Sequence, residues 1–196
     1  MDMESLIVYF DGLCEPVNPG GVATYGFVIY KGDEKIYEEA DVIGAGFLGD
    51  DVSNNVAEYT ALIRALEWLI RNGYTEKVIV RGDSQLAIRQ IIGRYAVRVK
   101  RIIPLYQRVM NLVKEFENIT FEWISRDKNK EADKLSRKAF EKFVKENLEE
   151  YVKHYGKYLL TEKQRELIEK LGGKVEPWMS KKKASELIDR LMRSKR

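Results

Sequence analysis

Apolar positions in the first part of the chain are spaced as in β-strands and then as in a helix. Ser5–Phe10 ends in four consecutive apolar residues, which predict a buried strand. The stretch YGFVIYK, Tyr25–Lys31, alternates, and Gly32–Asp33 supplies a hairpin turn into a further strand at Lys35–Ile43. Three antiparallel strands are therefore expected. The segment VAEYTALIRALEWLIRNG that follows has helical spacing and ends at a glycine.

The second part of the chain alternates between strand-like and helical segments. The predicted strands are Lys77–Arg81 and ITFEWIS (residues 119–125), and the predicted helices are SQLAIRQIIG (residues 84–93), Ile102–Phe116 and NKEADKLSRKAFEKFVKENL (residues 129–148). Strands that first follow one another and then alternate with helices are typical of a mixed sheet. We therefore expect an α/β fold with a mixed five-stranded sheet flanked by helices. Trp68 and Trp123 lie in apolar patterns and are expected in the core.

The pattern changes to short helices from about Glu149 onward. TEKQ, Thr161–Gln164, has the form of a capping box, and Gly172–Gly173 would end the helix that it starts. Ser180 can cap a second helix that ends near Met192. We predict one domain over residues 1–148 and a small α-helical extension over residues 149–196.

Composition limits the class of protein. The chain has 196 residues, of which 44% are hydrophobic and 33% charged, and this balance is typical of a folded globular protein rather than a disordered one. Its apolar runs are too short to cross a bilayer, and its start lacks the basic and apolar pattern of a secretion signal. Cys14 is the only cysteine, so no internal disulfide can form. We expect a cytoplasmic protein that does not bind a membrane.

The net charge of +3 conceals an asymmetry along the chain. Residues 1–93 contain 7 Lys and Arg against 15 Asp and Glu, whereas residues 94–196 contain 27 against 16. An acidic half joined to a basic half suits a metal site beside a phosphate-binding surface. Solvent-facing helix surfaces explain the same counts equally well.

Four acidic residues occupy positions at which strands end or helices begin. Asp83 follows a predicted strand and directly precedes Ser84, while Glu58 and Asp133 are expected in the first turns of their helices. Helix N-termini favour acids, so each of these three taken singly has a structural explanation. Asp11 does not, because it follows a buried strand and precedes no helix. Acids gathered at one sheet edge would repel one another unless hard divalent cations lay between them.

Four sequence blocks together resemble type 1 ribonuclease H. The blocks are YFDGLCEPVNPGGVATYG, SNNVAEYTAL, VRGDSQLAI and RDKNKEADKLS, and their order and spacing match the family over about residues 5–145. The resemblance implies a ribonuclease H-like sheet and hydrolysis of the RNA strand of RNA–DNA hybrids, leaving 5′-phosphate and 3′-hydroxyl ends. It also implies that the metal-binding carboxylates are Asp11, Glu58, Asp83 and Asp133.

The expected cofactor is Mg²⁺, with Mn²⁺ as a substitute and two ions bound together with substrate. In-line cleavage of a phosphodiester uses such a pair to activate water and to stabilise the leaving 3′-oxygen. Mg²⁺ retains several waters and takes few carboxylates, so four acids suffice without a His or Cys cluster.

The resemblance also suggests residues that contact substrate. Asn18, Asn55 and Gln85 match side chains that read the minor groove of the hybrid, and Ser53 matches a phosphate-anchoring hydroxyl. The alternatives are turn chemistry for Asn18 and helix capping for Asn55.

The chain departs from many bacterial members in two respects. It lacks their basic protrusion, as archaeal members do, and Arg126 stands where they carry a catalytic histidine. Arg126 is a candidate for product release or for balancing phosphate charge, with a solvated loop arginine as the alternative. The only histidine, His154, is expected to be a surface or packing residue.

Several questions stay open from the sequence. The expected partner is an RNA–DNA hybrid bound by a monomer, with double-stranded RNA or RNA–DNA junctions as further substrates, since all are A-like in shape. A non-catalytic nucleic-acid-binding module on the same fold is the alternative from another class. The extension over residues 149–196 is net positive, so it either supplies phosphate contacts or packs its apolar side, which includes Trp178 and Leu187, onto the rest of the protein.

Overall fold

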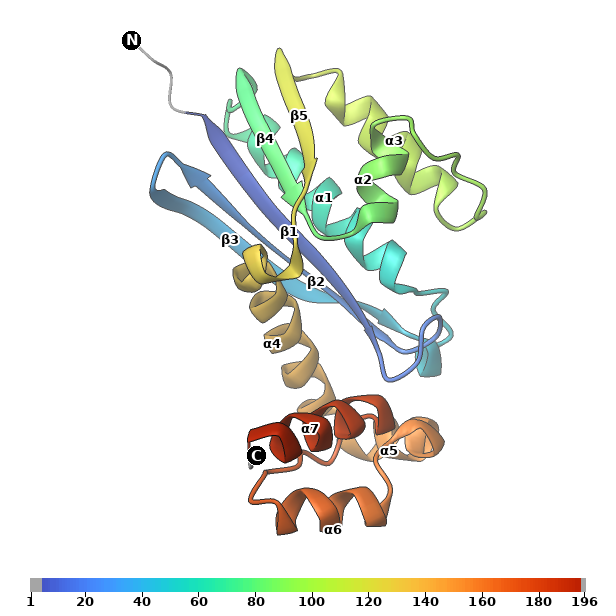
Figure 1. Cartoon of the computed structure of the whole chain (residues 1–196). Helices are drawn as coiled ribbons and strands as arrows, with labels where there is room; N and C mark the ends of the chain where they lie inside the picture. Colours follow the sequence, from blue (N-terminus) through green and yellow to red (C-terminus); the bar gives the residue numbers. More distant parts are fainter. Residues whose placement is uncertain (1–4, 195–196) are drawn as a thin grey trace.

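The computed structural model describes residues 5–194, which fold around one five-stranded sheet (Figure 1). The strands are β1 (Leu6–Glu15), β2 (Val22–Lys31), β3 (Glu34–Ala45), β4 (Lys77–Gly82) and β5 (Asn118–Trp123). Their order in the sheet is β3-β2-β1-β4-β5. β1 pairs antiparallel with β2, and β2 with β3, whereas β1–β4 and β4–β5 are parallel. The predicted mixed five-stranded sheet is confirmed.

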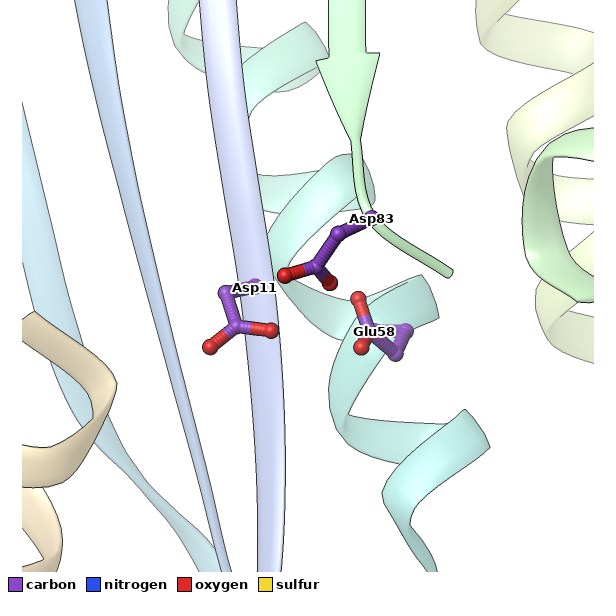
Figure 2. A group of neighbouring side chains, drawn as sticks. All are labelled: Asp11, Glu58 and Asp83. Carbon is purple, nitrogen blue, oxygen red and sulfur yellow. The ribbon is translucent and has the colours of Figure 1, made fainter. Parts of the chain in front are cut away.

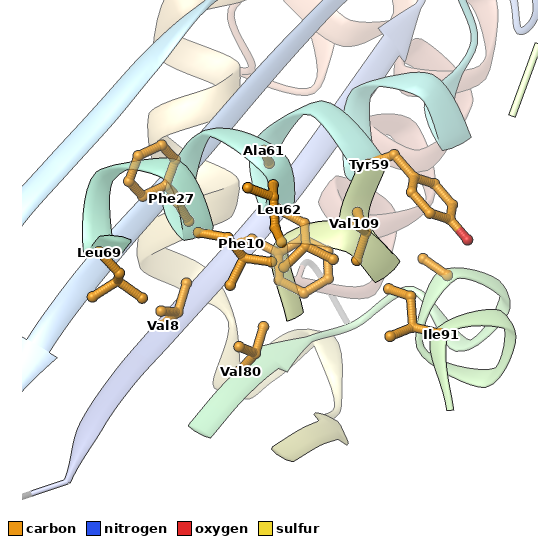
Figure 3. Close-up of a cluster of buried hydrophobic side chains, with 14 of the residues drawn as sticks. Val8, Phe10, Phe27, Tyr59, Ala61, Leu62, Leu69, Val80, Ile91 and Val109 are labelled. Atoms are coloured by element: carbon orange, nitrogen blue, oxygen red, sulfur yellow. The ribbon is translucent and has the colours of Figure 1, made fainter. Parts of the chain in front are cut away.

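Helices cover both faces of the sheet. They are α1 (Asn54–Arg71), α2 (Gln85–Ile91), α3 (Ile103–Val113) and α4 (Lys130–Glu146). Short 3₁₀ turns lie at Gly46–Leu48, Arg126–Lys128 and Gly156–Tyr158. α1, α2 and α3 share one apolar core with the sheet, in which Val8, Phe10 and Phe27 are fully buried against Leu62 and Leu69 of α1 (Figure 3). α4 lies across the other face of β1 and β2 (Figure 1).

Two predicted positions along the chain are wrong. Asp11 does not end a strand, because β1 continues to Glu15 by pairing with β2. Only the parallel ladder with β4 stops beside it, at the pair Phe10–Gly82. Glu58 is the fifth residue of α1 and therefore lies in its second turn, not its first.

The two tryptophans differ from each other. Trp68 stacks on Tyr37 and packs against the core, as predicted. Trp123 is 48% exposed, although its sequence context is apolar. It ends the edge strand β5, where no further strand covers it, and its indole N–H donates to the carbonyl of Asp83.

Three helices follow α4 instead of the two predicted. They are α5 (Leu148–Tyr155), α6 (Glu162–Lys170) and α7 (Lys181–Ser194), and the predicted capping box at Thr161 and Gln164 is present. Tyr151 and Tyr155 of α5 are buried in one apolar cluster with residues of β1, β2 and α4. The extension thus packs onto the rest of the protein. Within residues 5–194, no helix has the length and apolar character that crossing a membrane requires.

Candidate active site

Three acidic side chains meet where β4 leaves β1. Asp11 comes from the middle of β1, Asp83 follows the end of β4, and Glu58 comes from α1 (Figure 2). One carboxylate oxygen from each lies within 4.8 Å of the others. Because β4 ends at Gly82, no strand separates Asp11 from the other two. The sheet topology therefore brings together three acids that are far apart in sequence.

Gly12 allows α1 to approach the central strand. A Cβ placed on Gly12 would collide with the backbone nitrogen of Glu58 and with Ala57. Any larger residue would therefore push α1, and the Glu58 carboxylate with it, away from β1. The glycine that follows Asp11 in the sequence is thus part of what positions Glu58.

α4 supports the cluster from the other face of the sheet. Ser136 Oγ donates to Asp11 Oδ2 (3.2 Å) and also lies 3.0 Å from the carbonyl of Asp133. The amide of buried Asn129, just before α4, donates to the carbonyl of Phe10 (2.8 Å). A Cβ at Gly26 of β2 would lie 2.7 Å from the backbone nitrogen of Ser136, so a glycine is needed for α4 to come this close.

Burial and mutual repulsion disfavour the ionised acids. Asp11 and Glu58 are 5% and 3% exposed. Burial raises the pKa of Asp11 from 3.8 to about 7, and the charges of Asp83 and Asp133 add to the increase. Burial, followed by the charges of Asp11 and Asp83, also raises the pKa of Glu58 well above its ordinary value. The pKa of Asp83 is raised by burial, while nearby Arg126 acts in the opposite direction.

These acids lie in a cleft of about 580 Å³ that other predicted residues also line. Asp133, Arg126 and Asn18 are among them. Asp133 lies outside the group of three whose oxygens meet within 4.8 Å, although its charge acts on Asp11 and Asp83. Arg126 is exposed on the 3₁₀ turn that follows β5.

The predicted substrate-contacting residues either have local structural roles or lie outside the lining of the cleft. Asn18 Oδ1 accepts from the backbone nitrogen of Asn54 (2.8 Å), and Ser53 caps α1 by accepting from Val56. Gln85 is exposed at the start of α2. The described residues that line the cleft do not include Ser53, Asn55 or Gln85. The side-chain amide oxygen of Asn55, Oδ1, is buried and has no hydrogen-bond partner within residues 5–194.

Sequence reasoning missed the supporting residues. Ser136 follows Asp133 by three positions, so helical spacing alone places both on one face of α4. Asn129 precedes the helix as its N-cap residue. Lys182 and Lys183 of α7 also line the cleft, and nothing in their local sequence indicates this because it depends on how α5–α7 fold back.

The donor set fits a hard divalent cation. Glu58 Oε2 and Asp83 Oδ2 are buried and have no hydrogen-bond partner among the described residues. Buried carboxylate oxygens without donors are costly unless a cation is bound. The ligands are all oxygens, as Mg²⁺ and Mn²⁺ prefer. Asp11, Glu58, Asp83 and the neighbouring Asp133 could hold such ions.

Comparison with known protein sequences gives consistent matches. A family model described as reverse transcriptase-like matches residues 11–139, a range that contains all four acids. A bifunctional protein of Mycobacterium tuberculosis is 34% identical over 126 residues, which is 63% of this chain and 32% of that protein. The chain thus spans about a third of the length of this relative. Ribonuclease HI of Halobacterium salinarum is 34% identical over 134 residues, 68% of this chain and 63% of the enzyme.

Solved structures agree in fold. The N-terminal RNase H domain of a Mycobacterium tuberculosis protein superposes with a TM-score of 0.65 at 31% identity, covering 74% of this chain and 99% of that one. LC11-RNase H1, solved in complex with an RNA/DNA hybrid, gives a TM-score of 0.64 at 35% identity and covers 71% of this chain and 99% of its own.

Proposed function

The chain belongs to the type 1 ribonuclease H family, and on that premise we propose that it is an endonuclease that hydrolyses the RNA strand of RNA–DNA hybrids. In this proposal the enzyme acts as a monomer with two divalent cations, Mg²⁺ or Mn²⁺, and leaves 5′-phosphate and 3′-hydroxyl ends. The chain spans 32% of the Mycobacterium tuberculosis protein and 63% of the Halobacterium ribonuclease HI.

The meeting of three acids in one cleft carries the proposal. Asp11, Glu58 and Asp83 present oxygens within 4.8 Å of one another, and two of those side chains have buried oxygens without a hydrogen-bond donor. An arrangement of acids that costs stability unless a ligand is bound is typical of functional sites.

The residues of the chain have distinct roles in the proposed reaction. Two bound ions would supply activation of the attacking water and stabilisation of charge on the leaving 3′-oxygen. The ligands of these ions would be Asp11, Glu58 and Asp83. Asp133, which lies near Asp11 and Asp83, would be a further ligand. Ser136 fixes the orientation of the Asp11 carboxylate by its hydrogen bond, as outer-shell donors do in metal sites. A guanidinium offers N–H donors and no acceptor, so Arg126 would balance phosphate charge and not remove a proton.

Recognition of RNA requires contact with the ribose 2′-hydroxyl. Asn18 lines the cleft. Asn55, whose side-chain Oδ1 has no hydrogen-bond partner among the described residues, directly follows the cleft-lining Asn54 in the sequence. We keep Asn18, Asn55 and Gln85 as candidates for minor-groove contacts and Ser53 as a candidate for a phosphate contact.

A panel of substrates tests the proposal. The full chain is incubated with a matched RNA–DNA hybrid, double-stranded RNA and single-stranded RNA, each with Mg²⁺ and with a chelator. We expect Mg²⁺-dependent cleavage of the hybrid. Cleavage of double-stranded RNA as well would broaden the substrate class, and binding without cleavage of any substrate would instead indicate a nucleic-acid-binding module.

A further inference from the structure

The start of α7 forms part of the wall of the catalytic cleft. Lys182 and Lys183 line the same cleft as Asp11 and Asp83, although they come from the opposite end of the chain. The matched family model ends at residue 139, well before α7. In Figure 1, the extension α5–α7 lies at the end of the sheet where β1 is followed by β2.

Several contacts fix this part of α7 in place. The backbone nitrogen of Leu160 donates to the carbonyl of Met179 (2.9 Å), and Leu159 forms a bridge with Ser180. The hydroxyl of buried Tyr151 donates to the carbonyl of Trp178 (3.2 Å). Trp178 itself packs against the apolar cluster that joins α5 to the sheet and α4. The first turn of α7 is therefore held to the body of the protein, and its lysines have a defined position.

The two lysines are incompletely neutralised by neighbouring acids. Lys183 Nζ lies 3.8 Å from Glu15 and 3.9 Å from Glu186, both near the limit for an ion pair. Arg137 lies closer to Glu15, at 3.3 Å. Lys182 is exposed and forms no ion pair with any residue in the range 5–194.

A lysine at this position offsets the negative charge of the acids that line the cleft. Residues 149–196 contain 13 Lys and Arg against 8 Asp and Glu, whereas residues 1–148 contain 21 against 23. An acidic cleft repels the phosphates of a nucleic acid except where cations balance the charge. A flexible lysine ammonium suits a phosphate contact that requires charge but no fixed geometry.

We propose that Lys182 and Lys183 bind a backbone phosphate of the nucleic acid, so that the C-terminal helices form one side of the substrate-binding surface. The inference rests on the proposed function, since it assumes the same cleft and substrate. Lys183 lies beside Glu15, which is four residues beyond Asp11 on β1, or roughly 13 Å along an extended strand. The phosphate that the lysines bind is therefore a few nucleotides from the scissile phosphate. It lies toward the C-terminal end of β1, where Glu15 is.

The test compares Lys182→Gln, Lys183→Gln and the double variant with wild type. Glutamine removes the charge but keeps much of the side-chain length. The Michaelis constant for a long RNA–DNA hybrid is measured as a function of salt concentration. In B-form duplexes, loss of one phosphate contact lowers the log–log salt slope by about 0.9, and between 1 M and 0.1 M salt this slope corresponds to about an eightfold change in affinity. We expect this rise in the Michaelis constant, with turnover at saturation and melting temperature unchanged.

Lys163→Gln is the matched control. Lys163 is an exposed lysine of α6 that does not line the cleft, and its substitution changes the net charge by the same amount. Lys182→Arg keeps the charge and is expected to retain wild-type behaviour. If Lys182→Gln and Lys183→Gln match Lys163→Gln in Michaelis constant and salt slope, the lysines do not contact substrate and the inference is wrong.

Hybrids that end close to the cleavage site on one side or the other locate the contact. Trimming the side that passes α7 should remove the difference between the double variant and wild type, whereas trimming the other side should leave it. Equal effects from both sides would mean a diffuse field instead of a contact and would overturn the inference.

Binding of the same hybrid, measured by fluorescence anisotropy with a chelator present, separates this inference from the proposed function. A wild type that binds the hybrid with the chelator but does not cleave it when Mg²⁺ is supplied refutes the nuclease, and the lysine variants are then compared by dissociation constant. If wild type cleaves and the variants bind as tightly as Lys163→Gln, only the inference fails. A wild type that neither binds nor cleaves the hybrid refutes both.

Discussion

The hydroxyl of Ser136 donates a hydrogen bond to Asp11 Oδ2 across 3.2 Å, and this contact joins α4 to the central strand at the centre of the acidic cluster. The bond stabilises the ionised form of Asp11, whose pKa burial raises to about 7. Its loss should therefore raise that pKa further and loosen the carboxylate.

For Ser136→Ala we predict a fall in turnover of about 10- to 100-fold, as for other outer-shell partners of metal ligands. The acidic limb of the profile of rate against pH should also move to higher pH, because the Asp11 carboxylate would bind its proton more tightly. Steady-state rates between pH 5 and 9 measure both effects. A reduced rate with an unshifted limb would mean that Ser136 serves only packing.

Asp11→Asn should stabilise the metal-free protein at pH 8. The substitution removes a buried charge and its repulsion with Asp83, so we expect an increase of about 1–3 kcal/mol in the free energy of unfolding. Denaturant titration in the presence of a chelator measures this change. A less stable variant at pH 8 would contradict the assignment of Asp11 as a destabilising acid.

The same substitution should alter how stability depends on pH. Asp11 has a pKa of about 7 in the folded protein and 3.8 as its ordinary value. Between these values the folded state holds a proton that the unfolded chain has released, so stability is present at low pH and is lost as pH rises toward 7. For wild type this loss approaches about 1.4 kcal/mol per pH unit, and the slope should be shallower in Asp11→Asn. Equal slopes in the two proteins would be evidence against the raised pKa.

Gly12→Ala should destabilise the protein and disable the site together. Its methyl group would collide with the backbone of α1 at Ala57 and Glu58. We expect a loss of about 1–3 kcal/mol in stability and a drop in activity, because Glu58 would move away from Asp11. Gly156→Ala is the control, since Gly156 has helical φ and open space around its Cβ position. A neutral Gly12→Ala variant would refute the tight approach of α1.

Tyr155→Phe tests the attachment of the extension. The hydroxyl of Tyr155 donates to the carbonyl of Gly20 (2.9 Å) and accepts from the backbone nitrogen of Phe47 (3.3 Å). Its removal should cost about 1–2 kcal/mol and lower the melting temperature by a few degrees. Tyr158→Phe, at a half-buried tyrosine whose hydroxyl makes no hydrogen bond within residues 5–194, should have little effect. Equal melting temperatures for the two variants would argue against this anchor.

The sequence predicts the sheet well and singles out the three acids that the structure brings together, because both leave local signals. Alternation and helical spacing mark each element of the sheet, and Asp11 is conspicuous as a carboxylate after four apolar residues. The continuation of β1 beyond Asp11 was missed because it depends on pairing with β2, which no local pattern reports. The exposure of Trp123 follows from the edge position of β5, a property of the whole sheet.

The surroundings of the acids were harder to predict. Ser136 and Asn129 act through contacts with β1, more than a hundred residues away in the chain. α5 has no clear start signal in the sequence, because only Asn147 separates it from α4 and no side-chain cap hydrogen bond marks its first turn. The position of Lys182 depends on the packing of α5–α7 and has no signal in its own neighbourhood.

The central claim is that the acids in the cleft cleave the RNA strand of a hybrid. The most direct measurement uses a hybrid with differently labelled RNA and DNA strands, incubated with wild type, Asp11→Asn or Asp83→Asn at saturating Mg²⁺. We predict that wild type cuts the RNA strand and leaves the DNA strand intact, and that both folded variants lose more than about a hundredfold of this activity. Cleavage of the DNA strand, or RNA cleavage that persists in either variant or in a chelator, would contradict the account.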